Sequence, residues 1–127
     1  MRRWWVMGLL LAIGACAIFG PPGQRYVVYY QEWSAALDDS AKQVVAQAAD
    51  WANGHQTFAI EVAGYADPEG SPQANRDLSR TRAQRVADAL IAQGVAPQRI
   101  AVRAHGAVGF AMDSQESRRV TITFGTP

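Results

Sequence analysis

The residues best suited to recognising a small charged molecule are Asp67 and Arg82, fifteen positions apart. Asp67 lies in a segment rich in proline and glycine, and Arg82 lies in the following run, whose pattern predicts a helix. Arg82 would stand roughly 12 Å along that helix, and its side chain, directed back toward the helix start, can approach the loop. Such a pair suits a zwitterionic ligand, because the carboxylate attracts an ammonium group and the guanidinium clamps a carboxylate. The competing interpretation is a salt bridge between Asp67 and Arg82 that only ties loop to helix.

The elements that must position this pair alternate along the chain. Hydrophobic periodicity predicts strands at 26–30, 58–63, 100–104 and 120–124, and helices at about 39–53 and 73–93. Asp38 is the expected cap of the first helix, Gly64 the expected end of the second strand, and Gly94 the expected stop of the second helix. Leu78, Val86 and Leu90 are assigned to the core. The order β-α-β-α-β-β predicts an α+β two-layer sandwich, with a mixed sheet, right-handed parallel crossovers and both helices on one face.

Composition excludes several classes of function. The chain has 127 residues, enough for one domain, and its net charge of +1 gives no reason to expect a nucleic-acid partner. His55 and His105 are isolated and the one cysteine lies near the N-terminus, so neither a metal nor another cofactor is expected. Asp67 and Glu69 are close in sequence, but no histidine base is linked to them by a motif. We therefore do not expect an enzyme.

Residues 1–20 are predicted to be a signal peptide or an N-terminal membrane anchor, followed by a short Pro/Gly linker at 21–25. Arg2 and Arg3 precede an uncharged run from 4 to 20. Residues 12–16 resemble a bacterial lipobox, which implies cleavage before Cys16 and its lipidation, although the residues after Cys16 are apolar and a lipoprotein tether is usually polar. Ala15-Cys16-Ala17 also fits a signal-peptidase site that would release a soluble protein. An uncleaved anchor is the third alternative.

Residues 62–90 carry a pattern of fixed spacing that resembles the OmpA-like peptidoglycan-binding domain. That family has Gly-(His/Tyr)-Thr-Asp, two residues, Gly, and then Asn-x-x-Leu-Ser-x-x-Arg-Ala-x-x-Val. The positions in register here are Gly64, Tyr65, Asp67, Gly70, Asn75, Leu78, Ser79, Arg82, Ala83 and Val86. Later matches are Gly94-Val95, Arg99-Ile100 and Arg118-Arg119-Val120. The resemblance covers 26–125, which we take as the domain.

The resemblance implies a ligand and roles for four residues. The family binds the diaminopimelate end of the peptidoglycan stem peptide, with the positions of Asp67 and Arg82 as the principal pair. Asn75 would line the same pocket or, alternatively, only hold the first turn of the helix. Arg118 would lie near the ligand or, alternatively, be a solvated charge at a strand end.

The implied function is the non-covalent linkage of a membrane to the cell wall. The chain would face the periplasm of a bacterial envelope, held in the outer membrane or, alternatively, in the inner membrane, and other envelope proteins could be additional partners.

The chain departs from the family pattern at several positions. Ala66 replaces the threonine before the aspartate, and Ser117 replaces the asparagine of Asn-Arg-Arg. Residues 29–33 lack the usual Phe-x-Phe-Asp motif, and the connection 106–116 is shorter than is typical. These changes predict weaker binding or an altered peptide preference. The alternative function is an envelope interaction or assembly domain of the same fold that has lost most peptidoglycan binding.

Overall fold

The computed structural model describes residues 24–68, 70–107 and 117–125, and these form strands and helices in the predicted order. The elements are β1 (Arg25–Tyr29), α1 (Asp39–Gly54), β2 (Ile60–Ala66), α2 (Pro72–Ala92), the 3-10 helix η1 (Pro97–Arg99), β3 (Ile100–Ala107) and β4 (Arg119–Phe124). Only η1, a single turn that leads into β3, was not predicted from the sequence.

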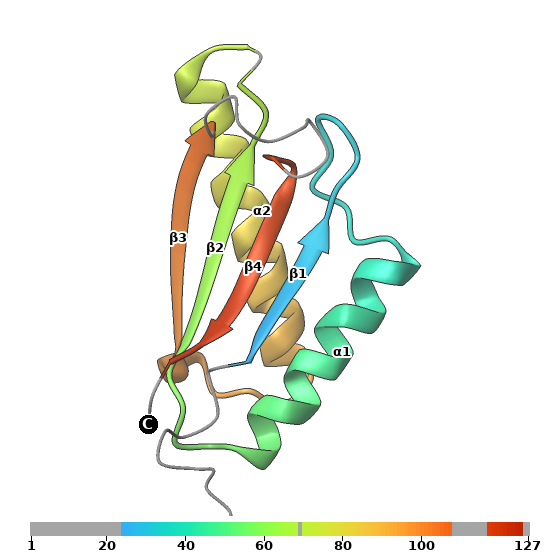
Figure 1. The fold of residues 1–127 in the computed structure, drawn as a ribbon, viewed down its shortest axis with the longest axis vertical. Helices are drawn as coiled ribbons and strands as arrows, with labels where there is room; N and C mark the ends of the chain where they lie inside the picture. Colours follow the sequence, from blue (N-terminus) through green and yellow to red (C-terminus); the bar gives the residue numbers. More distant parts are fainter. Residues whose placement is uncertain (1–23, 69, 108–116, 126–127) are drawn as a thin grey trace, which may run out of the picture.

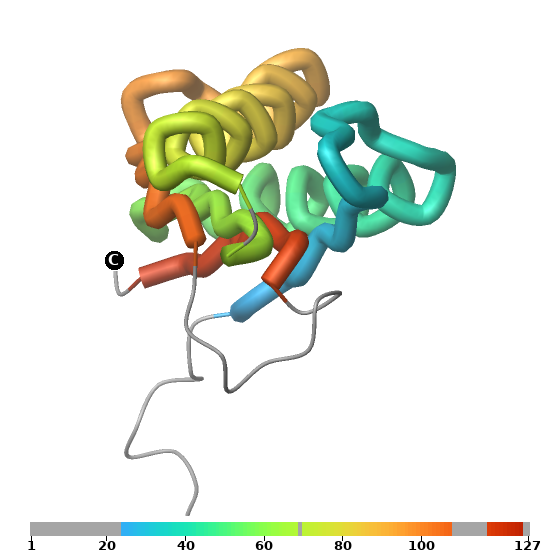
Figure 2. Tube along the Cα trace, turned by 90° about the horizontal axis from the view of Figure 1, so that it is seen from above, coloured from blue at the N-terminus to red at the C-terminus, as the bar shows by residue number. Residues whose placement is uncertain are grey.

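The strands form one mixed sheet with the order β1-β4-β2-β3. β2 and β3 pair in parallel, as expected of a β-α-β unit, whereas β4 is antiparallel to both of its neighbours. β1 and β2 therefore run in the same direction with β4 inserted between them (Figure 1). Both helices lie on the same side of the sheet (Figure 2). The predicted α+β two-layer sandwich is confirmed.

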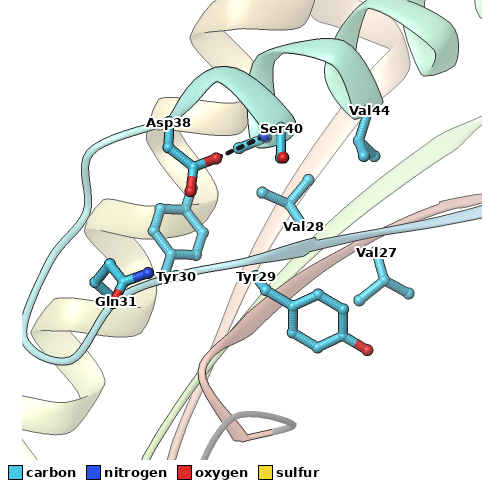
Figure 3. A pocket seen from close by; sticks show the side chains of 9 residues that line it. Val27, Val28, Tyr29, Tyr30, Gln31, Asp38, Ser40 and Val44 are labelled. Carbon is cyan, nitrogen blue, oxygen red and sulfur yellow. Dashed lines mark hydrogen bonds between the residues drawn. The ribbon is translucent and has the colours of Figure 1, made fainter.

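α1 begins where predicted and packs on the edge strand β1. The Asp38 carboxylate accepts a hydrogen bond from the Ala41 backbone N–H at 2.8 Å, which satisfies one of the free donors of the first turn. Alternation along β1 sends Val28 toward α1 and its neighbours Val27 and Tyr29 toward the opposite side (Figure 3). Val28 is buried in the core, whereas Tyr29 is 44% exposed.

The second strand does not stop at Gly64, as the sequence predicted, but continues to Ala66. Gly64 is present because α2 passes very close to it. A Cβ atom added at Gly64 would lie 2.0 Å from the carbonyl oxygen of Ser79, a backbone atom of α2. β3 is also longer than predicted, because Ala66 pairs with Ala107 beyond an irregularity in the register. The glycine thus marks a close helix–strand approach rather than a strand end.

α2 is the long helix that carries most of the candidate residues. Ser71 caps it by accepting from the Ala74 N–H at 3.0 Å, and the next residue, a proline, occupies the first turn, where its missing N–H costs nothing. The helix ends two residues before Gly94, whose φ of 97° is the left-handed conformation predicted for it.

The buried face of α2 combines apolar and polar side chains. Val86 and Leu90 are in the core, as predicted, but Leu78 is not: it is only partly buried and lines a pocket near the start of the helix. The polar members of the buried face are Asn75, Ser79 and Arg82. A helix that buries an arginine on this face must supply that charge with partners.

Replacing Gly64 with alanine is expected to destabilise the fold by about 1–3 kcal/mol, because the added methyl group must push the α2 backbone away from β2. Chemical denaturation measures the free energy of unfolding. Gly54→Ala is the matched control, since a Cβ atom there meets nothing within 4 Å. Equal stabilities of the two variants would contradict the close approach at Gly64.

Candidate functional site

The four candidate residues come together at the end of the sheet where β1 and β2 terminate (Figure 1). Asp67 directly follows β2, Asn75 and Arg82 project from α2, and Arg118 directly precedes β4. All four line one pocket, whose other walls are Glu32, Trp33 and Leu78. Sequence reasoning did not identify Glu32 and Trp33 as pocket residues, because the loop after β1 has no periodicity that indicates where its side chains point.

The guanidinium group of Arg82 is fully buried and is held by three backbone carbonyl groups. Its Nε donates to Ser34 O at 2.7 Å, Nη2 to Gln31 O at 3.0 Å and Nη1 to Tyr65 O at 3.2 Å. Arg82 therefore joins α2 to the β1–α1 loop and to the end of β2. An arginine has five N–H groups, so one on each terminal nitrogen is not used by these three bonds.

Tyr30 forms the floor beneath Arg82. Its ring centroid is 5.0 Å from Cζ of Arg82, and its hydroxyl donates to the backbone carbonyl of Arg82 at 3.2 Å. Burial raises the pKa of Tyr30, so the phenol is neutral at physiological pH. Burial also lowers the pKa of Arg82, an effect that Tyr30 and then Asp67 oppose. The Asp67 charge is therefore close enough to act on Arg82.

Asp67 forms its ion pair with Arg118 and not with Arg82. Oδ2 of Asp67 is 3.1 Å from Nη1 of Arg118, and the Ser117 hydroxyl donates to Oδ1. Arg118 also donates through Nε to the Tyr30 carbonyl at 3.2 Å. The interpretation of Asp67 and Arg82 as a simple salt bridge is thus wrong for the described residues. Ser117, which we counted as a departure from the family pattern, provides a hydrogen bond to the central carboxylate.

The charges around the pocket suit a zwitterion. Arg82 and Arg118 contribute two positive charges, and Asp67 contributes one negative charge. Glu32, an exposed residue of the loop after β1, adds a second negative charge. The formal charges of these four side chains therefore cancel, and an ammonium and a carboxylate of one ligand would each find the opposite charge. The side chains of Asp67 and Arg118 are only 12% and 18% exposed, which limits screening by solvent.

Asn75 lies in the first turn of α2 and is 1% exposed. Its backbone N–H donates to Ser71 O at 3.0 Å, so it belongs to the capped helix start. Its side chain lines both the Asp67 pocket and a neighbouring cavity between the β2–α2 loop and the end of β3. The two roles considered from the sequence, holding the helix start and lining the pocket, are compatible.

The Asp67 pocket is almost closed. Its cavity volume is about 10 Å³, close to the least that holds one water molecule. Trp33 is one of its walls, and this residue has a φ of 55°, a left-handed conformation that costs a non-glycine residue about 1 kcal/mol or more. A ligand larger than water therefore needs a wall of the pocket to move.

Other parts of the described structure offer no comparable set of charges. The cavity between β1 and α1 is lined by none of the four candidate residues (Figure 3). Over the ranges that the structure describes, no three His, Cys, Asp or Glu side chains gather closely enough to hold a metal ion. Within the same ranges, no helix has the length and apolar character needed to cross a bilayer. Residues 1–20, with Cys16, and residues 108–116 of the connection before β4 lie outside the described residues.

Two curated proteins show detectable sequence similarity to this chain. They are the peptidoglycan-associated lipoproteins of Mesorhizobium japonicum and Agrobacterium fabrum, each 30% identical over 79 residues. The aligned region is 62% of this chain and 47% and 45% of those proteins, respectively. The chain thus spans about half the length of the curated relatives it matches.

Solved structures show the same fold at low sequence identity. The peptidoglycan-associated lipoprotein from Burkholderia pseudomallei aligns with a TM-score of 0.73 and 24% identity, covering 79% of this chain and 90% of that chain. The OmpA-like domain of FopA1 from Francisella tularensis aligns with a TM-score of 0.74 and 21% identity, covering 84% of this chain and 75% of that chain.

A family match extends over most of the chain, including every element from the end of β1 to the first half of β4. The family model of the OmpA family matches residues 29–121. That span contains Asp67, Asn75, Arg82 and Arg118. Because the match covers well over half of the chain, this protein belongs to the OmpA family.

Proposed function

We propose that the Asp67 pocket binds the free amino-acid end of diaminopimelate in the peptidoglycan stem peptide, and that the chain thereby links a membrane to the cell wall. The observation that carries the proposal is the convergence of Asp67, Arg82 and Arg118 on one pocket at the end of the sheet. The names of the curated relatives support the choice of peptidoglycan as the partner. The proposed activity is binding without catalysis, and it requires no cofactor.

The proposed contacts follow from the charges. Asp67 would accept the ammonium group, using lone pairs that Arg118 and Ser117 leave free, since a carboxylate offers about four acceptor positions. Arg82 would clamp the ligand carboxylate with the N–H groups on Nη1 and Nη2 that its bonds to Tyr65 and Gln31 do not use. Its three carbonyl bonds fix the fork in advance, so little side-chain entropy would be lost on binding.

Arg118 and Asn75 would complete the site. Arg118 already neutralises Asp67 in the empty pocket, and on binding it would share that carboxylate with the ligand ammonium or turn toward the ligand carboxylate. Asn75, whose side chain is buried in the pocket wall, would limit the depth to which the ligand enters.

The N-terminal segment supplies the proposed membrane attachment. We propose that residues 1–20 target the chain to the envelope, that Cys16 carries the lipid, and that the domain at 26–125 faces the periplasm from the outer membrane. The nine residues from Ala17 to Arg25 extend at most about 30 Å, so the domain would stay close to its membrane.

A specific observation favours the second candidate function, that of an envelope assembly domain with weak or absent peptidoglycan binding. The cavity volume of about 10 Å³ does not admit an amino-acid head group without movement. Ala66 also lacks the hydroxyl of the family threonine. The two functions differ in one measurable property, which is affinity for the muropeptide.

Isothermal titration of the full chain with a diaminopimelate-containing muropeptide is expected to give heat of binding, and Asp67→Asn is expected to weaken the affinity about tenfold to hundredfold. The reason is the loss of a charge-assisted hydrogen bond, worth about 1.5–3 kcal/mol. Circular dichroism of the variant checks that the fold survives loss of the ion pair with Arg118.

The control for this titration is Glu61→Gln. Glu61 pairs with Arg103 at 3.2 Å on β2 and β3, and both side chains are about half exposed, at 48% and 61%. This variant also removes one carboxylate from an ion pair, but it should bind like the unaltered chain. Absence of heat with the unaltered chain would favour the assembly function, and equal losses in the two variants would exclude the Asp67 pocket as the site.

Mass spectrometry of the mature N-terminus tests the attachment. We expect a polypeptide that begins at Cys16 and carries a diacylglyceryl group on its sulfur. Cys16→Ser should abolish the added lipid mass and release the chain from the membrane fraction. An intact Met1 would contradict lipidation and favour an uncleaved anchor, whereas an unmodified terminus after residue 15 or 17 would indicate a released protein.

A further inference from the structure

We propose that Trp33 is the gate of the Asp67 pocket: its indole must leave Gly70 before an amino-acid head group can enter, and it then closes over the aliphatic chain of the bound ligand. The inference rests on the proposed function and deepens it, because it names the residue that controls entry and favours ligands with an apolar stem. It starts from the turn after β1, where Trp33 stands between two fixed points.

The base of this turn is rigid. The Ser34 N–H donates to Gln31 O at 3.1 Å, which closes the turn. The buried guanidinium of Arg82 binds the carbonyls of the same two residues, Gln31 and Ser34. Trp33 is therefore held at the tip of a turn whose two ends are both attached to α2.

The tip itself is held in an unusual conformation. The φ of Trp33 is 55°, the left-handed region that this position of a turn normally fills with glycine. The side chain is also 54% exposed, so the hydrophobic effect of burial does not explain why the residue is held there. A bulky residue in this region indicates a functional constraint or a conformation held by its contacts.

The contact that holds the ring is with Gly70, across the pocket. A Cβ atom added at Gly70 would lie 2.8 Å from Cη2 and 3.5 Å from Cζ2 of Trp33. The ring edge therefore packs directly on the Gly70 backbone, which has its own left-handed φ of 90°. This contact joins the β1–α1 loop to the β2–α2 loop and closes the pocket between them.

Space for a ligand exists on the far side of this contact. Gly70 and Asn75 also line the neighbouring cavity of about 200 Å³, whose walls include Arg76 and His105. The Asp67 pocket, with about 10 Å³, shares Asn75 with that cavity. Moving the indole away from Gly70 would remove a wall of the smaller pocket and allow the rest of a peptide to extend into the larger one.

The gate makes a kinetic prediction that a merely structural tryptophan does not. If the closed form predominates, with the open form at a tenth or less, binding proceeds only from the open fraction. Removing the indole should then raise the association rate constant about tenfold. The dissociation rate constant should rise as well, because the ring no longer covers the ligand.

The experiment is stopped-flow binding of a diaminopimelate-containing muropeptide to the full chain and to Trp33→Ala and Trp33→Gly. Both variants should associate about tenfold faster and dissociate faster than the unaltered chain. Trp33→Gly also relieves the left-handed backbone, so agreement between the two variants assigns the effect to the ring. Tyr29→Ala is the control, since Tyr29 is another exposed aromatic residue and does not line the pocket.

The possible results separate the gate from the function. Binding by the unaltered chain with an unchanged association rate in both variants would overturn the gate and leave the proposed function standing. Binding by the two variants and not by the unaltered chain would support a gate that is closed almost all of the time. Binding by none of the three would overturn the proposed function, and the gate with it.

Discussion

The buried guanidinium of Arg82 is the constraint on which the rest of this structure depends. It carries a charge into the interior, which is costly unless every part of the group finds a partner. The partners are carbonyls from two segments that are distant in sequence, the β1–α1 loop and the end of β2. Helix, loop and strand end therefore cannot take independent positions, and the pocket exists because Arg82 brings its walls together.

A second network completes the same end of the sheet. Asp67, just beyond β2, is held by Arg118 and Ser117, just before β4, and Arg118 also reaches the carbonyl of Tyr30. The two networks share Tyr30, whose ring lies against Arg82. Stability and recognition thus use the same side chains, and we infer that the empty pocket is held ready by groups that a zwitterionic ligand would contact.

The fold was largely predictable from periodicity, whereas local exceptions were not. Alternation and helical spacing located each strand and helix, because these patterns report which face is buried. Gly64 was taken as a strand end, since a sequence does not show that another backbone passes beside it. Leu78 was assigned to the core by spacing, although its turn of α2 faces the pocket.

The grouping of Asp67, Asn75, Arg82 and Arg118 was predictable only through the family pattern, which fixes positions in three dimensions that spacing alone leaves open. The choice of Arg118 as the partner of Asp67 depends on β4 lying beside β2, a long-range pairing without a local signal. Trp33 could not have been identified, because neither its left-handed backbone nor its contact with Gly70 leaves a mark in the sequence.

The most direct test of the central claim is an NMR titration that follows arginine side-chain N–H resonances as a diaminopimelate-containing muropeptide is added. The account predicts that the resonances of Arg82 and Arg118 shift together and saturate with the same dissociation constant, while those of Arg103 on β3 stay in place. Shifts confined to backbone resonances of β1 and α1, around the cavity of Figure 3, with Arg82 and Arg118 unmoved, would contradict it.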